Sequence, residues 1–280
     1  VTNQKYAFVT TEAGLSIVDI SNPSNPVETD FITTLHGYEK VKVRDNYAYV
    51  LENQTLRVID ISNFLTPFIT EYQIELGFHN DIDIYEDCLY LVQVPGGLRI
   101  FDISESENLV ETNSYYIYGN GPSIIADSIY VYIADSGRVS IIEVTDLNIP
   151  QKISDFVTGY LYHQEDIDIS DSYIFLAEGN KGLCIIDISD PYNPLQIRRY
   201  STNHAKCITV NNNYAYLGDW PKGIIILDIS NPSSPIKINN IDIKYVNEIV
   251  IIDNYAYIAA DETGLQIYDI SDPFNPFKVG

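Results

Sequence analysis

Short runs in which aromatic, β-branched and small residues alternate recur along this chain, separated by turn residues. They read YAFV from Tyr6, YAYV from Tyr47, CLYL from Cys88, YVYI from Tyr130, YIFL from Tyr173, YAYL from Tyr214 and YAYI from Tyr255. Residues of these kinds favour β-strands. No segment has the i, i+3, i+4, i+7 spacing of apolar residues that an amphipathic helix needs. The pattern therefore predicts an all-β chain.

A longer motif follows each of these runs. Its copies are LSIVDISNPSNP from Leu15, LRVIDISNFLTP from Leu56, LRIFDISESENL from Leu98, VSIIEVTDLNIP from Val139, LCIIDISDPYNP from Leu183, IIILDISNPSSP from Ile224 and LQIYDISDPFNP from Leu265. The starts lie 41, 42, 41, 44, 41 and 41 residues apart, an interval typical of four-stranded propeller blades. With one short run before the aromatic run and another after the motif, the repeat predicts a seven-bladed β-propeller of four-stranded antiparallel blades, with strands A to D in chain order.

The seven blades are predicted to form one closed domain over residues 1–280. Their approximate bounds are 1–35, 36–76, 77–119, 120–160, 161–202, 203–243 and 244–280. Val1 and Thr2 are expected to end a strand A, and residues 277–280 to begin a strand D. Because both end blades look trimmed and the sequence contains no methionine, we expect the chain to be a fragment of a longer one.

An aspartate in the motif invites a catalytic interpretation because it recurs so regularly. An active site needs one asymmetric cluster, whereas equal positions in every blade favour a repeated turn or capping hydrogen bond. The Ser-Asn/Asp-Pro segment that follows predicts the end of strand C, because proline has no N–H to donate. The aspartates are Asp19, Asp60, Asp102, Asp187, Asp228 and Asp269, with Glu143 in the fourth copy.

This repeat, an LxIVD-like strand followed by Ile-Ser-Asn/Asp-Pro and preceded by Tyr-Ala-Tyr-Val, resembles the LVIVD-repeat family of bacterial and archaeal surface or secreted β-propellers. The resemblance covers essentially the whole chain. It implies an extracytoplasmic propeller, often one module of a larger cell-surface protein, with no catalytic residues in the repeat. The third and fourth copies depart most from the pattern, since residues 105–108 replace a two-proline turn and Glu143 replaces the aspartate.

The charge balance narrows the range of partners. The chain has 39 acidic and 16 basic residues, a formal net charge of −23, and no basic stripe that could hold a phosphate backbone, which excludes nucleic acid. It has no apolar run of about 18 residues that would predict insertion into a membrane. Cys88, Cys184 and Cys207 fall on strands of three different blades, and we expect them to be buried free thiols.

The rarest side chains are predicted to share one face of the propeller. The D–A and B–C loops emerge on one side of the blades, here called the loop side, and the A–B and C–D turns emerge on the other, the turn side. The turns repeat nearly the same residues whereas the loops vary, so we expect the loop side to bind a partner. Its candidates are His36, His79, His163, His204 and Trp220, with four acids at one equivalent position after strand B: Glu52, Asp135, Glu178 and Asp219.

A second group of polar residues lies on strand A. Asp81 and Asp83, like Asp166 and Asp168, are two residues apart and therefore lie on the same side of their strand, and Glu248 holds an equivalent position. We expect these side chains to line a water-filled channel. Converging carboxylates from this set would also suit a hard cation such as Ca²⁺. The histidines come from four blades, which disfavours a tetrahedral zinc site.

Three functions remain open from the sequence. The first is a non-catalytic binding or assembly module outside the cell or at its surface, which needs no cofactor, engages a protein or a glycan, and could also self-assemble. The second is a cation-dependent propeller enzyme of the lactonase or glycan-processing type, with its cation at Asp83, Asp168 and Glu248. The third is a carbohydrate-binding lectin that stacks sugars on Trp220 and nearby tyrosines, although Trp220 has no counterpart in other blades.

Overall fold

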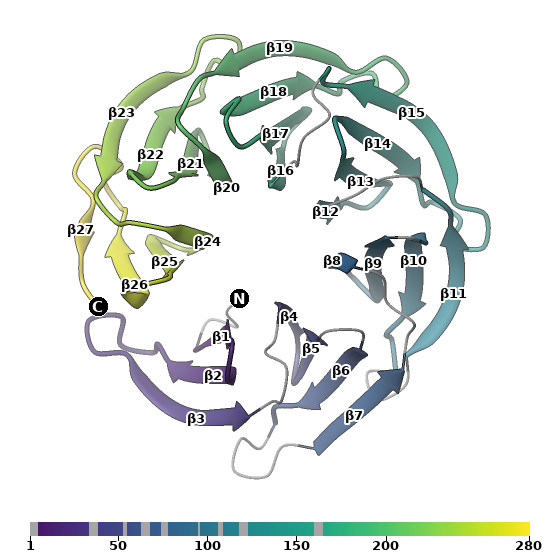
Figure 1. Ribbon diagram of the computed structural model, residues 1–280, viewed down its shortest axis with the longest axis horizontal. Coiled ribbons are helices and arrows are strands. Elements are labelled where there is room, and N and C mark those ends of the chain that lie inside the picture. The colour runs from purple at the N-terminus through teal and green to yellow at the C-terminus, as the bar shows by residue number, and fades with distance from the viewer. Residues whose placement is uncertain are drawn as a thin grey trace. The chain divides into compact units, whose positions relative to one another are not determined.

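The computed structural model confirms the predicted fold class. It describes residues 5–33, 39–52, 55–62, 68–73, 78–94, 96–105, 109–117, 123–159 and 165–280. These residues form 27 strands and no helix, arranged in seven sheets, one for each copy of the motif (Figure 1). Six sheets have four strands and the first has three, because its expected strand A at Val1 and Thr2 lies outside the described residues. The fold is that of a seven-bladed β-propeller.

The chain divides into two compact units, Val1–Tyr132 with Ile142–Gln151, and Ile133–Ile141 with Lys152–Gly280. The single domain predicted over residues 1–280 stays a prediction. In the described residues there is no helix that could span a membrane.

The first three sheets belong to the first unit. Their strands are β1 (Tyr6–Thr11), β2 (Gly14–Asp19) and β3 (Val27–Thr33); β4 (Lys40–Arg44), β5 (Tyr47–Glu52), β6 (Thr55–Asp60) and β7 (Phe68–Gln73); and β8 (Phe78–Tyr85), β9 (Cys88–Val94), β10 (Gly97–Asp102) and β11 (Val110–Tyr115). The fourth sheet contributes residues to both units and contains β12 (Ser123–Ala126), β13 (Tyr130–Asp135), β14 (Arg138–Glu143) and β15 (Gln151–Val157).

The last three sheets belong to the second unit and follow one another in chain order (Figure 1). Their strands are β16 (Asp166–Ser170), β17 (Tyr173–Ala177), β18 (Leu183–Asp187) and β19 (Leu195–Tyr200); β20 (Ala205–Asn211), β21 (Tyr214–Asp219), β22 (Gly223–Asp228) and β23 (Ile236–Ile241); and β24 (Val246–Ile252), β25 (Tyr255–Ala260), β26 (Gly264–Asp269) and β27 (Phe277–Lys278).

Strands A to D pair in chain order within each sheet, as the repeat predicts. In the sixth sheet, β20, β21, β22 and β23 are neighbours in that order and all pairs are antiparallel. The C–D pair has a bulge between Ile226 and Leu227, and equivalent bulges occur in the first, third and fifth sheets. A bulge bends the strand that carries it and increases its twist, so the outer strand curves in the same way in these four blades. The C–D pair of the second sheet has no such bulge.

The A–B turns use the left-handed backbone that their Asn and Asp residues predict. Asp45, Asn212 and Asp253 have φ values of 52°, 53° and 52°, a region that Asn and Asp tolerate better than most residues. In all seven blades the A–B turn also accepts a hydrogen bond at 2.8 Å from the N–H of the residue after strand C, as in Ile229 to Asn213 and Ile270 to Asn254. This bond fixes the end of strand C against the turn.

The regular aspartate of the motif is a turn residue, as predicted. In the six blades that contain it, its Oδ1 accepts the backbone N–H of the serine two residues later at 2.8–2.9 Å. In the fourth blade the hydroxyl of Thr145 donates to Glu143 Oε1 at 3.0 Å. Hydrogen bonds from the hydroxyl and N–H of the serine hold the pKa of four of these carboxyls below the ordinary value: Asp19, Asp102, Asp228 and Asp269.

Acidification is expected to weaken these turns. A carboxylate whose folded-state pKa lies below 3.8 stabilises the fold above that value, and the contribution is lost as the pH falls through the folded-state pKa. The melting temperature of the variant Asp228→Asn/Asp269→Asn should therefore decrease less than that of the wild type between about pH 5 and pH 2.5. Glu12→Gln/Glu262→Gln removes two exposed carboxylates from B–C loops and should behave like the wild type. Equal losses in the aspartate variant and the wild type would contradict this prediction.

Apolar faces of successive sheets pack together within each unit. Clusters of buried side chains join the first sheet to the second, the second to the third, the fifth to the sixth and the sixth to the seventh. The aromatic runs supply the fully buried rings of Tyr49, Tyr132 and Tyr216, and burial raises the pKa of Tyr216 to about 12. The aromatic stripe is therefore inter-blade core.

The three cysteines are free thiols, as predicted. Cys184 and Cys207 are buried and Cys88 is half-buried. Burial raises the pKa of Cys184 to about 12 and that of Cys207 well above its ordinary value. Because the thiolate is the reactive form of cysteine, these two residues behave as small apolar side chains of the core.

Candidate binding surface on the loop side

Two of the five predicted histidine and tryptophan candidates have described side chains. His36 and His163 lie outside the described residues, and His79 lies on β8, with no description of its side chain. His204 directly precedes β20 and Trp220 directly follows β21. Their rings meet on the loop side of the second unit, where they form the centre of a group that we call the His204–Trp220 cluster.

Trp220 is held by contacts within its own blade and with the seventh blade. Its ring centroid lies 6.1 Å from that of His204, with the planes 29° apart, and 5.8 Å from that of Tyr245, with the planes 85° apart. The indole N–H donates a hydrogen bond of 2.6 Å to the carbonyl of Val246. Since Val246 begins β24, this bond ties the B–C loop of the sixth blade to the first strand of the seventh.

Tyr245 has a backbone conformation that is rare for its side chain. Its φ is +55°, in the left-handed region that a bulky residue seldom occupies. Its carbonyl accepts the N–H of Asp261 at 3.2 Å, and its ring packs edge-on against Trp220. A backbone held in a sparsely populated conformation by its surroundings is typical of a functional surface.

An ion pair lies beside Trp220. Lys206 Nζ is 5.5 Å from the centroid of the Trp220 ring and 2.7 Å from Glu165 Oε2. Glu165 Oε1 is 3.5 Å from His204 Nε2, and His204 Nδ1 is 3.0 Å from Asn180 Oδ1. The cluster therefore presents aromatic, cationic, anionic and amide groups together, which is the chemical variety that selective recognition needs.

The four acids after strand B hold equivalent positions, as the sequence predicts, but they are buried. Glu52, Asp135, Glu178 and Asp219 are 3%, 2%, 6% and 2% exposed. Glu52 Oε2 lies 2.6 Å from Arg57 Nε, and Glu178 pairs with Arg199. A buried carboxylate is costly unless it is paired or hydrogen-bonded. These acids therefore stabilise the loop side as buried residues. The sequence predicts them as exposed binding residues, and that prediction is wrong.

Asp219 shows how such an acid positions the cluster. Its Oδ1 accepts the backbone N–H groups of Asn203 and His204 at 2.9 and 2.7 Å, and its Oδ2 accepts the side-chain amide of Asn203 at 3.0 Å. Three donors thus converge on one buried carboxylate. Asp219 thereby fixes the backbone just before β20, and with it the ring of His204.

Two acids of strand A, Asp81 and Asp83, are not the solvated channel residues that the sequence predicts. Asp81 and Asp83 are only 6% and 8% exposed. Asp81 Oδ2 accepts the N–H of Ile124 at 3.1 Å, and Asp83 Oδ2 accepts the N–H of Ala126 at 2.9 Å. Asp83 Oδ1 also lies 2.9 Å from Lys42 Nζ. These side chains link the first strands of three successive blades, because an edge strand leaves N–H groups that a neighbouring carboxylate can accept.

The fifth and sixth blades repeat this arrangement. Asp166 Oδ2 accepts the N–H of Ile208 at 2.9 Å, and Asp168 Oδ2 accepts the N–H of Val210 at 2.6 Å. The part of the chain that the structure describes contains no group of three or more His, Cys, Asp or Glu side chains that could hold a metal ion. The cation site suggested at Asp81, Asp83, Asp166, Asp168 and Glu248 stays a prediction, and inter-blade hydrogen bonds account for four of its five carboxylates.

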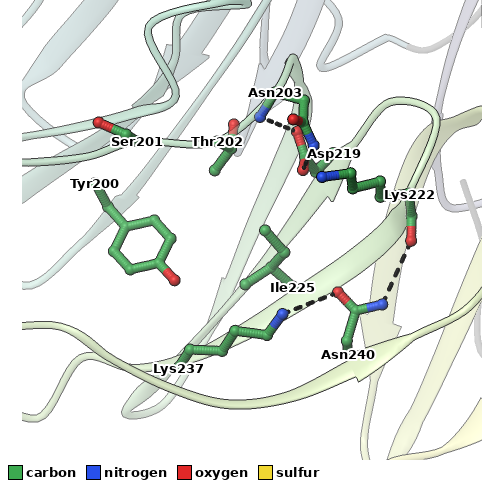
Figure 2. A pocket seen from close by; sticks show the side chains of 9 residues that line it. All are labelled: Tyr200, Ser201, Thr202, Asn203, Asp219, Lys222, Ile225, Lys237 and Asn240. Atoms are coloured by element: carbon green, nitrogen blue, oxygen red, sulfur yellow. Dashed lines mark hydrogen bonds between the residues drawn. The ribbon is translucent and has the colours of Figure 1, made fainter.

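A pocket of about 310 Å³ lies next to this region in the second unit. Figure 2 shows Ile225 in its middle, with Tyr200 on one side and Lys222 and Asn240 on the other. Asn240 accepts a hydrogen bond from Lys237 Nζ and donates one to the carbonyl of Lys222, both at 3.3 Å. No pattern in the sequence predicts this pocket, because its walls come from separate parts of the chain: the ends of β19 and β21, a D–A loop, a B–C loop and the strands β22 and β23.

The sequence of the repeat identifies the family. A model of the LVIVD repeat matches residues 3–34, 38–70, 77–116, 163–202, 203–242 and 244–280. The chain belongs to the LVIVD-repeat family. The fourth copy, with Glu143 in place of the aspartate, lies outside the matched segments. Its strands β12–β15 nevertheless form a four-stranded sheet like those of the LVIVD repeats beside it.

Solved structures with other sequences share the architecture of this LVIVD-repeat chain. A functionally unknown protein from Desulfotomaculum acetoxidans is 14% identical, with a TM-score of 0.76 over 95% of this chain and 93% of that one. The WD40 domain of Neurospora crassa Pan2 is 10% identical (TM-score 0.73; 96% and 87% covered), and BamB from Moraxella catarrhalis is 11% identical (0.67; 96% and 83%). At these identities the likeness shows the fold alone. No curated protein matches the sequence.

Proposed function

We propose that this chain is a non-catalytic binding module that acts outside the cytoplasm, at or beyond the cell surface, and engages a protein or glycan through its loop side. The contrast between the two sides of the second unit carries the proposal. On the turn side, the same aspartate-to-serine and strand-to-turn bonds recur in the fifth, sixth and seventh blades. On the loop side, the B–C loops of these blades read EGNK, DWPK and DET. A varied surface on a repeated scaffold suits selective binding.

Charge supports the same assignment. Between residues 165 and 280, the loop side mixes acidic residues with four lysines, namely Lys181, Lys206, Lys222 and Lys244. The charged residues of the turns and of the last position of strand C are all acidic: Asp171, Asp187, Asp190, Asp228, Asp253, Asp269 and Asp272. Complementary charges favour the right partner, and like charges oppose the wrong one. The mixed loop side is therefore better suited to selective contact.

The contacts of the other candidate residues favour binding over the two alternatives. A cation-dependent enzyme would use Asp83 and Asp168, yet each of these carboxylates already accepts a backbone N–H from the next blade. A lectin that stacks a sugar on Trp220 would need an open ring face, whereas the rings of His204 and Tyr245 both pack against this indole. We therefore assign Trp220 to holding the loop-side surface in shape.

Charge reversal on the loop side is expected to weaken partner binding. Lys181→Glu/Lys244→Glu changes two exposed loop-side lysines, and Lys5→Glu/Lys278→Glu changes two exposed lysines elsewhere by the same charge. Immobilised variants would be compared for capture of the partner from the cell envelope of the native host. We expect about fivefold lower retention by the loop-side variant, with faster loss as salt rises, and wild-type retention by the control. Equal retention by both variants, or loss only in the control, would contradict the proposal.

A further inference from the structure

The pocket beside the loop side has the size of a site for a single small ring. Its volume of about 310 Å³ is at the lower end of the range of about 300–1,000 Å³ that is typical of ligand pockets. Residues of the fifth and sixth blades line it, and all of them lie within the second unit. A pocket of this size excludes a folded protein surface but admits one sugar-sized group.

Two lysines give the pocket a charge opposite to that of the chain. The protein carries 39 acidic and only 16 basic residues, yet both Lys222 and Lys237 line this one pocket. Neither ammonium forms an ion pair with the residues that the structure describes, and Lys237 has only a long hydrogen bond, 3.3 Å, to Asn240. An ammonium group has three donors, so both lysines retain N–H groups for an anion.

The remaining lining offers what a hydroxyl-rich ring requires. Tyr200 contributes an aromatic wall and a phenol (Figure 2), and aromatic faces combine an apolar surface with a polar end. Burial and the nearby charge of Asp219 raise the pKa of Tyr200, so its hydroxyl remains a donor. Asn240 presents an amide between the two lysines. The carboxylate of Asp219 also lines the pocket and accepts hydrogen bonds from the neutral N–H groups of Asn203 and His204. Two ammonium groups against this one carboxylate leave the lining with a net positive charge.

We propose that this pocket binds one hydroxyl-rich ring that carries a carboxylate, the chemistry of a uronic acid, either as a free sugar acid or as the terminal residue of a glycan. Lys222 and Lys237 bind the carboxylate, Asn240 and the Tyr200 hydroxyl bind ring hydroxyls, and the Tyr200 ring covers the apolar face of the sugar. The pocket shares Lys222 with the loop side, but it does not include Lys181 or Lys244, the two lysines whose charge reversal tests partner binding.

Glucuronic acid, glucose and acetate are the probes that test this site, by saturation-transfer NMR and calorimetry on the whole chain. Glucuronic acid is expected to bind at least about tenfold more tightly than glucose or acetate, because only it satisfies both the lysines and the hydroxyl partners. Lys222→Gln/Lys237→Gln should weaken it by about tenfold or more. Lys181→Gln/Lys244→Gln, which removes the same charge from exposed loop positions outside the pocket, should leave it unchanged.

A disaccharide with a terminal glucuronic acid distinguishes the two sources of the ligand. If the pocket binds both the disaccharide and free glucuronic acid, the ligand is the end of a glycan. If it binds only glucuronic acid, the ligand is a free sugar acid. Equal affinity for glucose or acetate, undiminished binding in Lys222→Gln/Lys237→Gln, or no binding at about 20 mM ligand would each overturn the proposal. None of these results would alter the capture of the envelope partner by the charge-reversal variants. The proposal of sugar-acid binding can therefore fail while the proposal of partner binding stands, and the reverse also holds.

Discussion

Replacing Arg199 by alanine is expected to lower the free energy of unfolding by about 3–5 kcal/mol. Arg199 Nη1 contacts Glu178 Oε2, and the side chain of Glu178 is only 4% exposed. The charge of Glu178 is thus compensated by a residue of β19 and not by water. Removing one partner of a buried ion pair leaves an uncompensated charge, which costs far more than the net contribution of the pair. Chemical unfolding followed by the fluorescence of Trp220, the only tryptophan, measures this loss in the second unit.

Arg198 is the matched control, because it is the neighbouring arginine on the same strand but is exposed. Arg198→Ala should change the free energy of unfolding by less than about 0.5 kcal/mol. Glu178→Gln/Arg199→Ala also removes the uncompensated charge of Glu178, and it should recover most of the free energy of unfolding that Arg199→Ala loses. Two results would contradict this prediction: equal free energies of unfolding for Arg199→Ala and Arg198→Ala, or a double variant no more stable than Arg199→Ala. Either would show that Arg199 does not compensate the buried charge of Glu178.

Asp219→Ala is expected to lower the free energy of unfolding by about 3 kcal/mol. The carboxylate is 2% exposed and accepts three hydrogen bonds, two from the backbone and one from the side chain of Asn203. Alanine leaves these donors without an acceptor in a site closed to water. The amides of Asn203 and His204 should then exchange their hydrogens faster, because they lose the bonds that fix the loop before β20. Unfolding curves and amide hydrogen exchange measure the two effects.

Asp261 provides the comparison for Asp219. It lies in the B–C loop of the seventh blade, but it is exposed, so Asp261→Ala should cost less than about 0.5 kcal/mol. Asp219→Asn keeps an oxygen that can accept the two backbone N–H groups, and it should lose less stability than the alanine variant. A cost for Asp219→Ala as small as that for Asp261→Ala would show that the buried carboxylate does not hold this loop.

Features set by local chain chemistry could be predicted from the sequence. The hydrogen bond from Ser230 to Asp228 spans two residues, and the left-handed turn at Asn212 depends on that residue and its neighbours. The strand order also follows from the repeat, because each short connection joins adjacent antiparallel strands. Seven copies of one motif therefore fix the fold class almost independently of the rest of the chain.

Contacts between blades were predicted less well, because the partners are distant in sequence. Asp81 and Asp83 were expected in a solvated channel, but they are buried and accept N–H groups of Ile124 and Ala126, in each case 43 residues further along. This separation equals one repeat, so a comparison of equivalent positions in consecutive copies could have found the pairs. Asp219 accepts the N–H groups of Asn203 and His204 in the D–A loop before β20, and the sequence of the loop alone does not show these bonds.

The candidate site was predicted only in part for the same reason. His204 and Trp220 were placed on one side by topology, and the structure brings their rings together. Tyr245 and Glu165 complete the cluster from loops of the seventh and fifth blades, and no motif marks either residue. The pocket residues Tyr200 and Lys237 lie on outer strands of different blades, where the sequence predicts only strand.

Photo-crosslinking from single positions tests the central claim, that the loop side is the binding surface. A benzoylphenylalanine placed at Pro221 or Asn247 reports on the loop side, and one placed at Ser233 or Phe274 reports on the turn side; all four positions are exposed. After irradiation in the native host, we expect covalent products with the partner from Pro221 and Asn247 and none from Ser233 and Phe274. Products from the turn-side positions, or none from the loop-side positions, would contradict the claim.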